Sequence, residues 1–299
     1  MKEKHIVFCG DDNFVIPICI MLESLTENNR DRRFIAHTFG DNLSEGSLAR
    51  LESVLKRSDS KLIIHTLPKG VSELLDNAPT QEHISITTYY RLFIPYVIGD
   101  DVDEVLYLDG DVLVCGKIDE LFDRKIDNAV LAGVPDLNEA DNVKRTGVDV
   151  YVNAGVLIIY VSAIRKMYSI EEMIGKIREY LAVPGKIIYG DQDIMNILYE
   201  GYIDKISDIY NFQRVMNKGW CLKHISYLKK VIVVHFITGD KPWNYDYSFI
   251  FAGRYYKYLK KYLKRSQRIL WHLGKIVGFF KLIKKHIGWS LSKKRQDIG

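Results

Sequence analysis

The residues best suited to chemistry in this chain are two carboxylates separated by one glycine, Asp109-Gly110-Asp111, directly after a short apolar run. Strand alternation places Asp109 and Asp111 on the same side of the backbone, and Gly110 leaves room for a ligand. Paired oxygen ligands of this kind suit Mg²⁺ or Mn²⁺, the ions that usually accompany diphosphates. The motif therefore predicts a metal-dependent enzyme with a nucleotide or phosphate substrate. The alternative is a hairpin turn, because Asp-Gly between apolar runs is also a hairpin signal.

The segments around this motif alternate between short apolar runs and helix-like stretches, which predicts an α/β fold with a mostly parallel sheet. We expect strands over residues 6–9, 34–39, 62–66, 105–107, 129–134, 154–160 and 231–236. We expect helices over residues 15–27, 44–56, 84–97, 168–181 and 191–199, the second capped by Ser44. Ligands of such sheets bind beyond the C-terminal strand ends. Asp11, after the first strand, and Asp109 are therefore expected to face one crevice.

Length and composition limit the class of protein. The 299 residues, 47% of them hydrophobic, suffice for one large α/β domain or two small ones. No run of ~18 apolar residues occurs, so no membrane-spanning helix is expected. The first apolar run is too short for a signal peptide, so secretion is not expected. Four scattered cysteines indicate reduced thiols of a cytosolic protein and no zinc site: Cys9, Cys19, Cys115 and Cys221.

The charge of the chain is distributed unevenly. Residues 254–299 hold 14 of the 42 lysine and arginine residues but only one of the 38 acidic residues, Asp297. This segment therefore carries +13 and the preceding residues carry −9, which together give the net charge of +4. An acidic body with a strongly basic tail predicts a polyanionic partner surface.

The basic segment also has the apolar period of a helix. Six apolar residues recur at alternating spacings of four and three: Ile269, Leu273, Ile276, Phe280, Ile283 and Ile287. This pattern predicts a basic amphipathic helix lying in a membrane interface, attracted to anionic lipid by roughly 1 kcal/mol per basic residue. The alternatives are a helix packed on its own domain, an oligomer interface or a nucleic-acid patch. We predict a catalytic domain over residues 1–250 and a membrane-associating tail over residues 251–299.

Six segments in order, spanning roughly residues 5–245, resemble those of the family 8 glycosyltransferases, which include bacterial lipooligosaccharide galactosyl- and glucosyltransferases and glycogenin. The segments lie at residues 5–13, 83–92, 107–114, 153–157, 190–196 and 235–243. The resemblance implies a GT-A type, Rossmann-like nucleotide-sugar-binding domain with a mixed central sheet. It also implies a UDP-sugar donor (UDP-galactose or UDP-glucose), Mn²⁺ or Mg²⁺ as cofactor, and retention of anomeric configuration.

Carried over position by position, the resemblance assigns roles to individual residues. The metal ligands would be Asp109, Asp111 and His235. Uridine would be held by Asp11, Asn13 and the backbone near Cys9 and Gly10. The donor sugar and its pocket would involve Arg91, Gly110, Asn153, Ala154, Asp191 and Gln192. The diphosphate would contact Gly239 and Lys241. One departure is that Thr238 stands where many relatives have a glycine, three residues after the metal histidine, which weakens the expectation for Gly239.

The chemistry expected from this resemblance is transfer to a saccharide acceptor, lipid-linked and part of cell-surface lipopolysaccharide or polysaccharide. We predict front-face attack, in which the leaving phosphate oxygen takes the acceptor proton. Gln192 would stabilise the cationic sugar, and Asp191 would hold a sugar hydroxyl. The expected location is the cytoplasm, at the inner face of the cell membrane, with no nucleic-acid partner.

Other functions and simpler roles for these residues stay open. The motif at residues 108–112 also resembles the first motif of haloacid-dehalogenase-type phosphatases, and a non-catalytic membrane-bound scaffold is a further alternative. His235 has a structural role as its alternative, and residues 11–13 a turn and helix cap. Asp191 and Asp193 would then be ordinary acids of a helix N-terminus, and Arg91 a helix-surface charge.

Overall fold

The structure is a computed structural model that describes residues 3–75, 78, 86–122, 124, 128–183, 185–213, 218–237, 239, 241–244 and 250–274. The chain forms two compact units. The first comprises Met1–Arg214 and Ser226–His235, and the second comprises Val215–Ile225 and Phe236–Gly299. The acidic motif and His235 therefore belong to the same unit.

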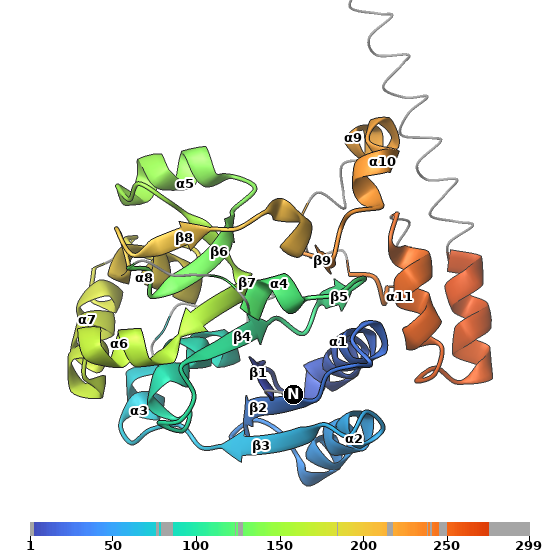
Figure 1. The fold of residues 1–299 in the computed structure, drawn as a ribbon, viewed down its shortest axis with the longest axis horizontal. Helices are drawn as coiled ribbons and strands as arrows, with labels where there is room; N and C mark the ends of the chain where they lie inside the picture. The colour runs from blue at the N-terminus through green and yellow to red at the C-terminus, as the bar shows by residue number, and fades with distance from the viewer. Residues whose placement is uncertain are drawn as a thin grey trace, which may run out of the picture. The chain divides into compact units, whose positions relative to one another are not determined.

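A seven-stranded sheet forms the centre of the first unit, in the order β3-β2-β1-β4-β7-β6-β8 (Figure 1). Its strands are β1 (Lys4–Val7), β2 (Phe34–Phe39), β3 (Lys61–His65), β4 (Glu104–Leu108), β6 (Leu131–Pro135), β7 (Val152–Tyr160) and β8 (Ile203–Lys205). Strands β3, β2, β1 and β4 are parallel, β7 is antiparallel to β4 and β6, and β8 is parallel to β6. The predicted α/β class with a mixed sheet is confirmed, and each predicted strand ends within two residues of its observed bounds.

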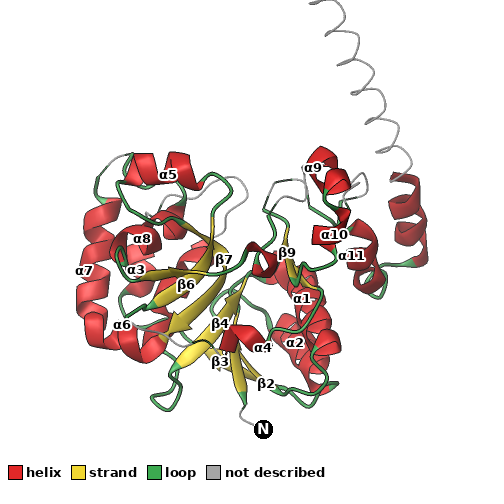
Figure 2. Ribbon diagram, turned by 45° about the horizontal axis from the view of Figure 1, so that its top comes forward, coloured by secondary structure: helices red, strands yellow, loops and turns green. Residues whose placement is uncertain are grey.

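Helices cover both faces of this sheet (Figure 2). One face carries α1 (Val15–Asn28) and α2 (Glu45–Lys56), which pack on each other. The other face carries α3 (Val71–Leu75), the 3₁₀ helix η2 (Ile86–Tyr96), α6 (Val161–Met167), α7 (Ile170–Leu181) and α8 (Gly190–Leu198). The shorter elements are η1 (Asp12–Phe14), α4 (Asp119–Phe122), α5 (Glu139–Thr146), η3 (Asp208–Tyr210) and α10 (Ile225–Leu228). A contiguous apolar core lies between the sheet and the second group of helices.

Local sequence signals explain where the helices begin. Ser44 caps α2 as predicted, since its side chain accepts a hydrogen bond from Ser47 N. The helix predicted over residues 84–97 differs from the structure, where Ile86–Tyr96 form a 3₁₀ helix. The β-branched residues at its start have low α-helix propensity, and Pro95 lacks the N–H that an α-helix requires.

The acidic motif connects two different sheets. Strand β4 lies in the large sheet, whereas β5 (Val112–Val114) pairs antiparallel with β9 (Val233–His235) in a separate two-stranded sheet. The hairpin alternative for Asp109-Gly110-Asp111 is therefore wrong, because the strands on either side of it do not pair with each other. In the small sheet Val112 is the register partner of His235, which brings the histidine beside the acidic motif.

The second unit contains α9 (Lys218–Lys223), α11 (Ala252–Leu259) and a helical segment over residues 265–274. Tyr255 of α11 is buried and packs edge-on against Phe236 and near Trp243, with ring centroids 5.5 Å and 6.1 Å apart. Tyr256 stacks on Trp271 at 3.8 Å. Among the described residues, no helix has the length and apolar character needed to span a membrane. The predicted amphipathic tail lies outside the described residues from position 275 onward.

Candidate active site

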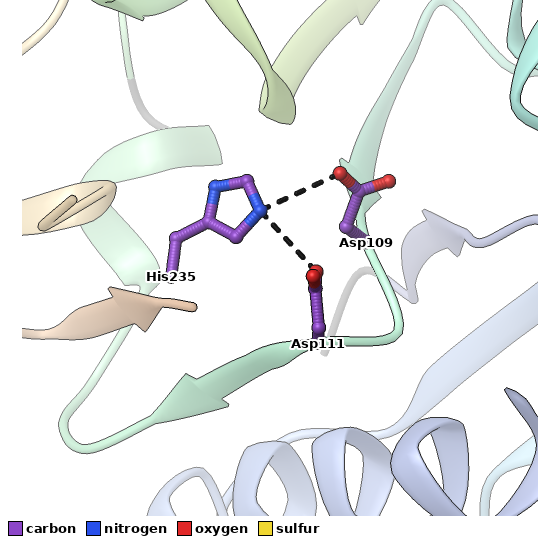
Figure 3. Close-up of side chains that lie close together, drawn as sticks. All are labelled: Asp109, Asp111 and His235. Carbon is purple, nitrogen blue, oxygen red and sulfur yellow. Dashed lines mark ion pairs between the residues drawn. The ribbon is translucent and has the colours of Figure 1, made fainter. Parts of the chain in front are cut away.

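Three side chains from separate elements converge at the edge of the large sheet. Asp109 follows β4, Asp111 precedes β5, and His235 ends β9. His235 Nε2 lies 3.2 Å from Asp111 Oδ1 and 3.6 Å from Asp109 Oδ2, and Figure 3 shows the ring facing both carboxylates. One ligand atom from each residue lies within 4.8 Å of the other two. Two carboxylates and an imidazole suit a divalent ion such as Mn²⁺ or Mg²⁺, so the residues fit such an ion.

Gly155 of β7 forms the floor under these side chains. Its carbonyl oxygen accepts a hydrogen bond from Asp109 N at 2.8 Å. A Cβ at this position would overlap Cε1 of His235 and lie 2.8 Å from Asp109 Oδ2. The site therefore has no room for a side chain at position 155. Gly155 had no predicted role of its own, although it lies in the segment at residues 153–157 that resembles the family.

Arg91 is a buried counter-ion and not a helix-surface charge. It is 4% exposed and lies 3.0 Å from Asp109 Oδ1 and 2.8 Å from Asp191 Oδ2. It also donates to the backbone oxygens of Thr88 and Ala154, at 2.9 Å and 2.5 Å. Burial opposes its charge, but the two carboxylates hold the pKa of Arg91 above its ordinary value. Burial raises the pKa of Asp191, and the guanidinium limits that rise.

Gln192 lies at the N-terminal end of α8 in a polar network. Its Oε1 accepts hydrogen bonds from Ala154 N at 3.0 Å and from Asn153 Nδ2 at 3.1 Å. Its Nε2 donates to Asp136 Oδ2 and to Tyr151 OH, both at 3.3 Å. The structure thus brings together the predicted site residues Gln192, Asn153 and Ala154. It adds Asp136 and Tyr151, which were not predicted. The amide orientation follows from Ala154 N, which can only donate.

Asp193 holds the loop before α8 in place. It is fully buried and accepts hydrogen bonds from both terminal nitrogens of Arg145, at 2.9 Å and 2.6 Å. It also accepts from the hydroxyl of Tyr151 and from the backbone N–H groups of Ile188 and Tyr189. Burial favours the neutral acid, but the bonds from Arg145 and Tyr151 hold the pKa of Asp193 below its ordinary value. Its role in this structure is structural.

The segment proposed to hold uridine forms a cap in this structure. Asp11 is the N-cap of η1 and accepts a hydrogen bond from Asn13 N at 2.9 Å. Cys9 is buried, and burial raises the pKa of its thiol to about 12. The turn and helix cap expected as the alternative are therefore present. Uridine binding by these residues stays a proposal.

Two glycines at this edge are required by packing against the start of α1. A Cβ at Gly10 would lie 2.7 Å from Ile18 Cδ1, and a Cβ at Gly110 would lie 2.8 Å from Ile18 Cγ1. Phe14 is the next neighbour of both, at 3.6 Å and 3.1 Å. The side-chain space of Gly110 is thus filled by the protein itself. Its glycine is explained by close packing, where we had expected room for a ligand.

The predicted diphosphate contacts belong to the second unit. Lys241 Nζ donates to the backbone oxygen of Phe236 at 2.6 Å. Gly239 is described, whereas Thr238 lies outside the described residues. Within its own unit Lys241 is therefore bonded to the residue that directly follows β9.

The chain is similar to known glycosyltransferases. The sequence model of glycosyl transferase family 8 matches residues 5–247. General stress protein A of Bacillus subtilis (strain 168) is 27% identical over 276 residues, which cover 85% of this chain and 92% of that protein. The lipopolysaccharide 1,3-galactosyltransferase of Salmonella typhimurium (strain LT2) is 24% identical over 254 residues, which cover 80% of this chain and 73% of that protein.

Solved structures support the same relationship. The crystal structure of the galactosyltransferase LgtC with donor and acceptor sugar analogues has a TM-score of 0.74 and 27% identity, covering 89% of this chain and 99% of LgtC. An LgtC structure with an active-site glutamine changed to glutamate has a TM-score of 0.73. The expected GT-A type fold is confirmed by this similarity. Because the family model covers the acidic motif, the α8 segment and His235 together, the chain belongs to glycosyl transferase family 8.

Proposed function

We propose that this glycosyltransferase moves galactose or glucose from a UDP-sugar to a saccharide acceptor, with retention of configuration, in cell-surface lipopolysaccharide or polysaccharide synthesis. The observation that carries the proposal is the Asp109–Asp111–His235 cluster at the sheet edge. Its chemistry suits a divalent ion that neutralises a diphosphate. LgtC, which was crystallised with donor and acceptor sugar analogues, and the Salmonella galactosyltransferase support the substrate class.

The three residues of the cluster would hold Mn²⁺ or Mg²⁺. Such an ion, when bound, acts as a Lewis acid that stabilises negative charge on the departing diphosphate. The diphosphate would also contact Gly239 and Lys241. Arg91 holds the Asp109 side chain in place through its 3.0 Å contact with Oδ1.

Donor binding would use the residues around the strand ends. Asp11, Asn13 and the backbone of Cys9 and Gly10 would hold uridine. The donor sugar would be contacted by residues beside the metal ligands: Arg91, Gly110, Asn153, Ala154, Asp191 and Gln192. Asp191 would accept a hydrogen bond from a sugar hydroxyl, and its Oδ2 is held 2.8 Å from the Arg91 guanidinium.

The transfer step would proceed by front-face attack. The leaving phosphate oxygen takes the acceptor proton, and Gln192 stabilises the developing positive charge on the sugar. An amide is a poor nucleophile, and Gln192 Oε1 already accepts two hydrogen bonds. A glutamine also occupies the active site of LgtC. A covalent sugar trapped on Gln192 or Asp191 would overturn this mechanism.

The acceptor would be lipid-linked and reached from the cytoplasmic face of the membrane, where the basic tail would bind anionic lipid. Three residues of the described helical segment 265–274 support this, since Ile269, Leu270 and Leu273 are each about half exposed. Lys264, Arg265 and Arg268 lie alongside them in the chain. An apolar stripe with flanking basic residues is typical of interfacial helices.

The test is a thermal-shift screen of UDP-galactose, UDP-glucose, UDP-N-acetylglucosamine and GDP-mannose, each with and without Mn²⁺. We expect one UDP-hexose to raise the melting temperature only with metal, and Asp111→Ala to abolish the effect. A shift without turnover of the sugar would favour the scaffold alternative. The phosphatase alternative fails to explain why the family match extends over residues 5–247.

A further inference from the structure

Asn211 lies against the metal-site histidine at the ring nitrogen that faces away from the carboxylates. Its Oδ1 is 3.0 Å from His235 Nδ1, whereas Nε2 faces Asp109 and Asp111. Asn211 is 1% exposed and directly follows η3. The backbone fixes it there, because His235 N donates to the oxygen of Phe212, the next residue, at 3.0 Å. The amide therefore has a defined place beside the ring.

The orientation of the Asn211 amide can be deduced from its neighbours. Gly155 N, which can only donate, lies 3.1 Å from Asn153 Oδ1. The Asp136 carboxylate, an acceptor when ionised, lies 3.3 Å from Asn153 Nδ2. The oxygen of Asn153 is thus the atom that faces Asn211, at 2.9 Å, and must receive the Asn211 amide N–H. The oxygen of Asn211 is then the atom that faces His235.

An oxygen at Nδ1 requires a proton on that nitrogen. In the neutral ring the hydrogen is then on Nδ1, and the lone pair is on Nε2, the nitrogen that faces the two carboxylates. This is the tautomer that binds a cation through Nε2. The hydrogen bond also prevents the ring from turning, because a rotated imidazole would leave a buried amide oxygen unsatisfied.

We propose that Asn211 is a positioning residue of the metal site, which fixes the tautomer and ring orientation of His235. This inference rests on the proposed metal role of Asp109, Asp111 and His235. Asn211 has no predicted contact with the sugar or the diphosphate. Its effect is therefore expected first on the affinity for the ion itself, with no nucleotide present.

The experiment measures Mn²⁺ affinity of the full chain by the electron paramagnetic resonance signal of the free ion. Asn211→Leu removes the acceptor, and we expect roughly 10–100-fold weaker binding. Asn211→Asp keeps an oxygen toward Nδ1 but loses the N–H given to Asn153, so it should lower the melting temperature while retaining Mn²⁺ affinity. Gln213→Leu is the matched control, since Gln213 is 5% exposed and bonds only backbone groups of Pro135 and Leu137 among the contacts described.

The variants separate positioning from general stability. A structural role would weaken Mn²⁺ binding in all three variants, and unchanged binding in Asn211→Leu would also overturn the proposal. Asn211→Ala carries the same expectation if the leucine variant does not fold. If the unaltered chain binds no Mn²⁺, or Asp111→Ala binds it equally well, the proposed function fails at its metal site. Normal binding that needs Asp111 but is indifferent to Asn211 refutes only the positioning role.

Discussion

Arg91 joins Asp109 to Asp191 at the start of α8 through a single guanidinium. It contacts Asp109 and Asp191 at 3.0 Å and 2.8 Å while almost completely buried. Leaving this buried guanidinium without its partners would cost about 3–5 kcal/mol. The same guanidinium therefore holds the proposed metal ligand Asp109 and the proposed sugar contact Asp191.

Substitution of Gly155 tests the close packing of the metal site at the same scale. Gly155→Ala places a methyl group where Cε1 of His235 lies and within 2.8 Å of Asp109 Oδ2. The backbone holds both residues in place, because Asp109 N is bonded to Gly155 O and His235 N to Phe212 O. We expect Mn²⁺ affinity to fall by roughly tenfold or more, the loss typical of a disturbed ligand shell. Titration followed by free-ion paramagnetic resonance measures it.

Gly175→Ala is the matched control for that substitution. Gly175 lies inside α7, and no heavy atom lies within 4 Å of its added Cβ. Alanine should stabilise the helix there by about 0.5–1 kcal/mol and leave Mn²⁺ affinity unchanged. If Gly155→Ala bound the ion as tightly as Gly175→Ala, the site would be more adaptable than its contacts indicate.

At the scale of elements, alternation of apolar runs predicts α1, α2, α7, α8 and the strands other than β5 and β8, because each of these depends on its own residues. The other α-helices of the described residues are not predicted, since they are mostly short. The pairing of β5 with β9 joins segments about 120 residues apart, and no local pattern specifies such a contact. The residues of the motif therefore indicate Asp109 and Asp111 by their own spacing, whereas His235 is indicated only through resemblance. Asn211 is missed for the same reason, since a lone asparagine after a short 3₁₀ helix carries no signal. Asp193 is the opposite case. By sequence it is an ordinary acid near a helix N-terminus, but in the structure its carboxylate holds the loop before α8.

A histidine stack across three parallel strands makes the stability of the fold depend on pH. His37 of β2 hydrogen-bonds His5 of β1 at 3.0 Å and His65 of β3 at 2.9 Å, and adjacent rings are stacked. Burial and the two neighbouring imidazoles lower the pKa of His37 to about 3. The unfolded chain binds this proton near pH 6.5, so stability is complete above that value and falls as pH decreases toward 3.

We therefore expect His37→Gln to remove part of the acid sensitivity of folding. Between pH 7 and pH 5, proton binding to His37 in the unfolded chain should lower the free energy of unfolding of the unaltered chain by about 2 kcal/mol. The slope is ~1.36 kcal/mol per pH unit below 6.5. Urea unfolding at both pH values measures the difference for each protein. His272→Gln is the control, because His272 is exposed and lies outside the stack. An equal pH dependence in His37→Gln and the unaltered chain would contradict the expectation.

At the scale of the whole molecule, charge and apolar surface both point to the C-terminal segment. The residues before Arg254 carry −9, so anionic lipid would repel them, whereas residues 254–299 carry +13. Aromatic contacts within the second unit determine where the chain can be truncated. Tyr255 packs against Phe236 and Trp243, and Tyr256 stacks on Trp271. Removal of everything after residue 250 would thus expose a core, while a chain ending at Gly274 keeps these contacts.

We predict that the chain ending at Gly274 loses most of its affinity for anionic vesicles but keeps UDP-sugar hydrolysis. Seven basic residues are removed, each worth roughly 1 kcal/mol near an anionic surface. Sedimentation with phosphatidylserine-containing and phosphatidylcholine vesicles, at low and high salt, measures the loss.

The full chain with lysines 275, 281, 284 and 285 changed to glutamine is the control. It separates the effect of charge from that of the apolar stripe, because it keeps the apolar stripe. Equal sedimentation of the truncated and full chains would refute the membrane role, since neither charge nor apolar area would then matter. Lost hydrolysis in the truncated chain would instead place the tail in the catalytic machinery.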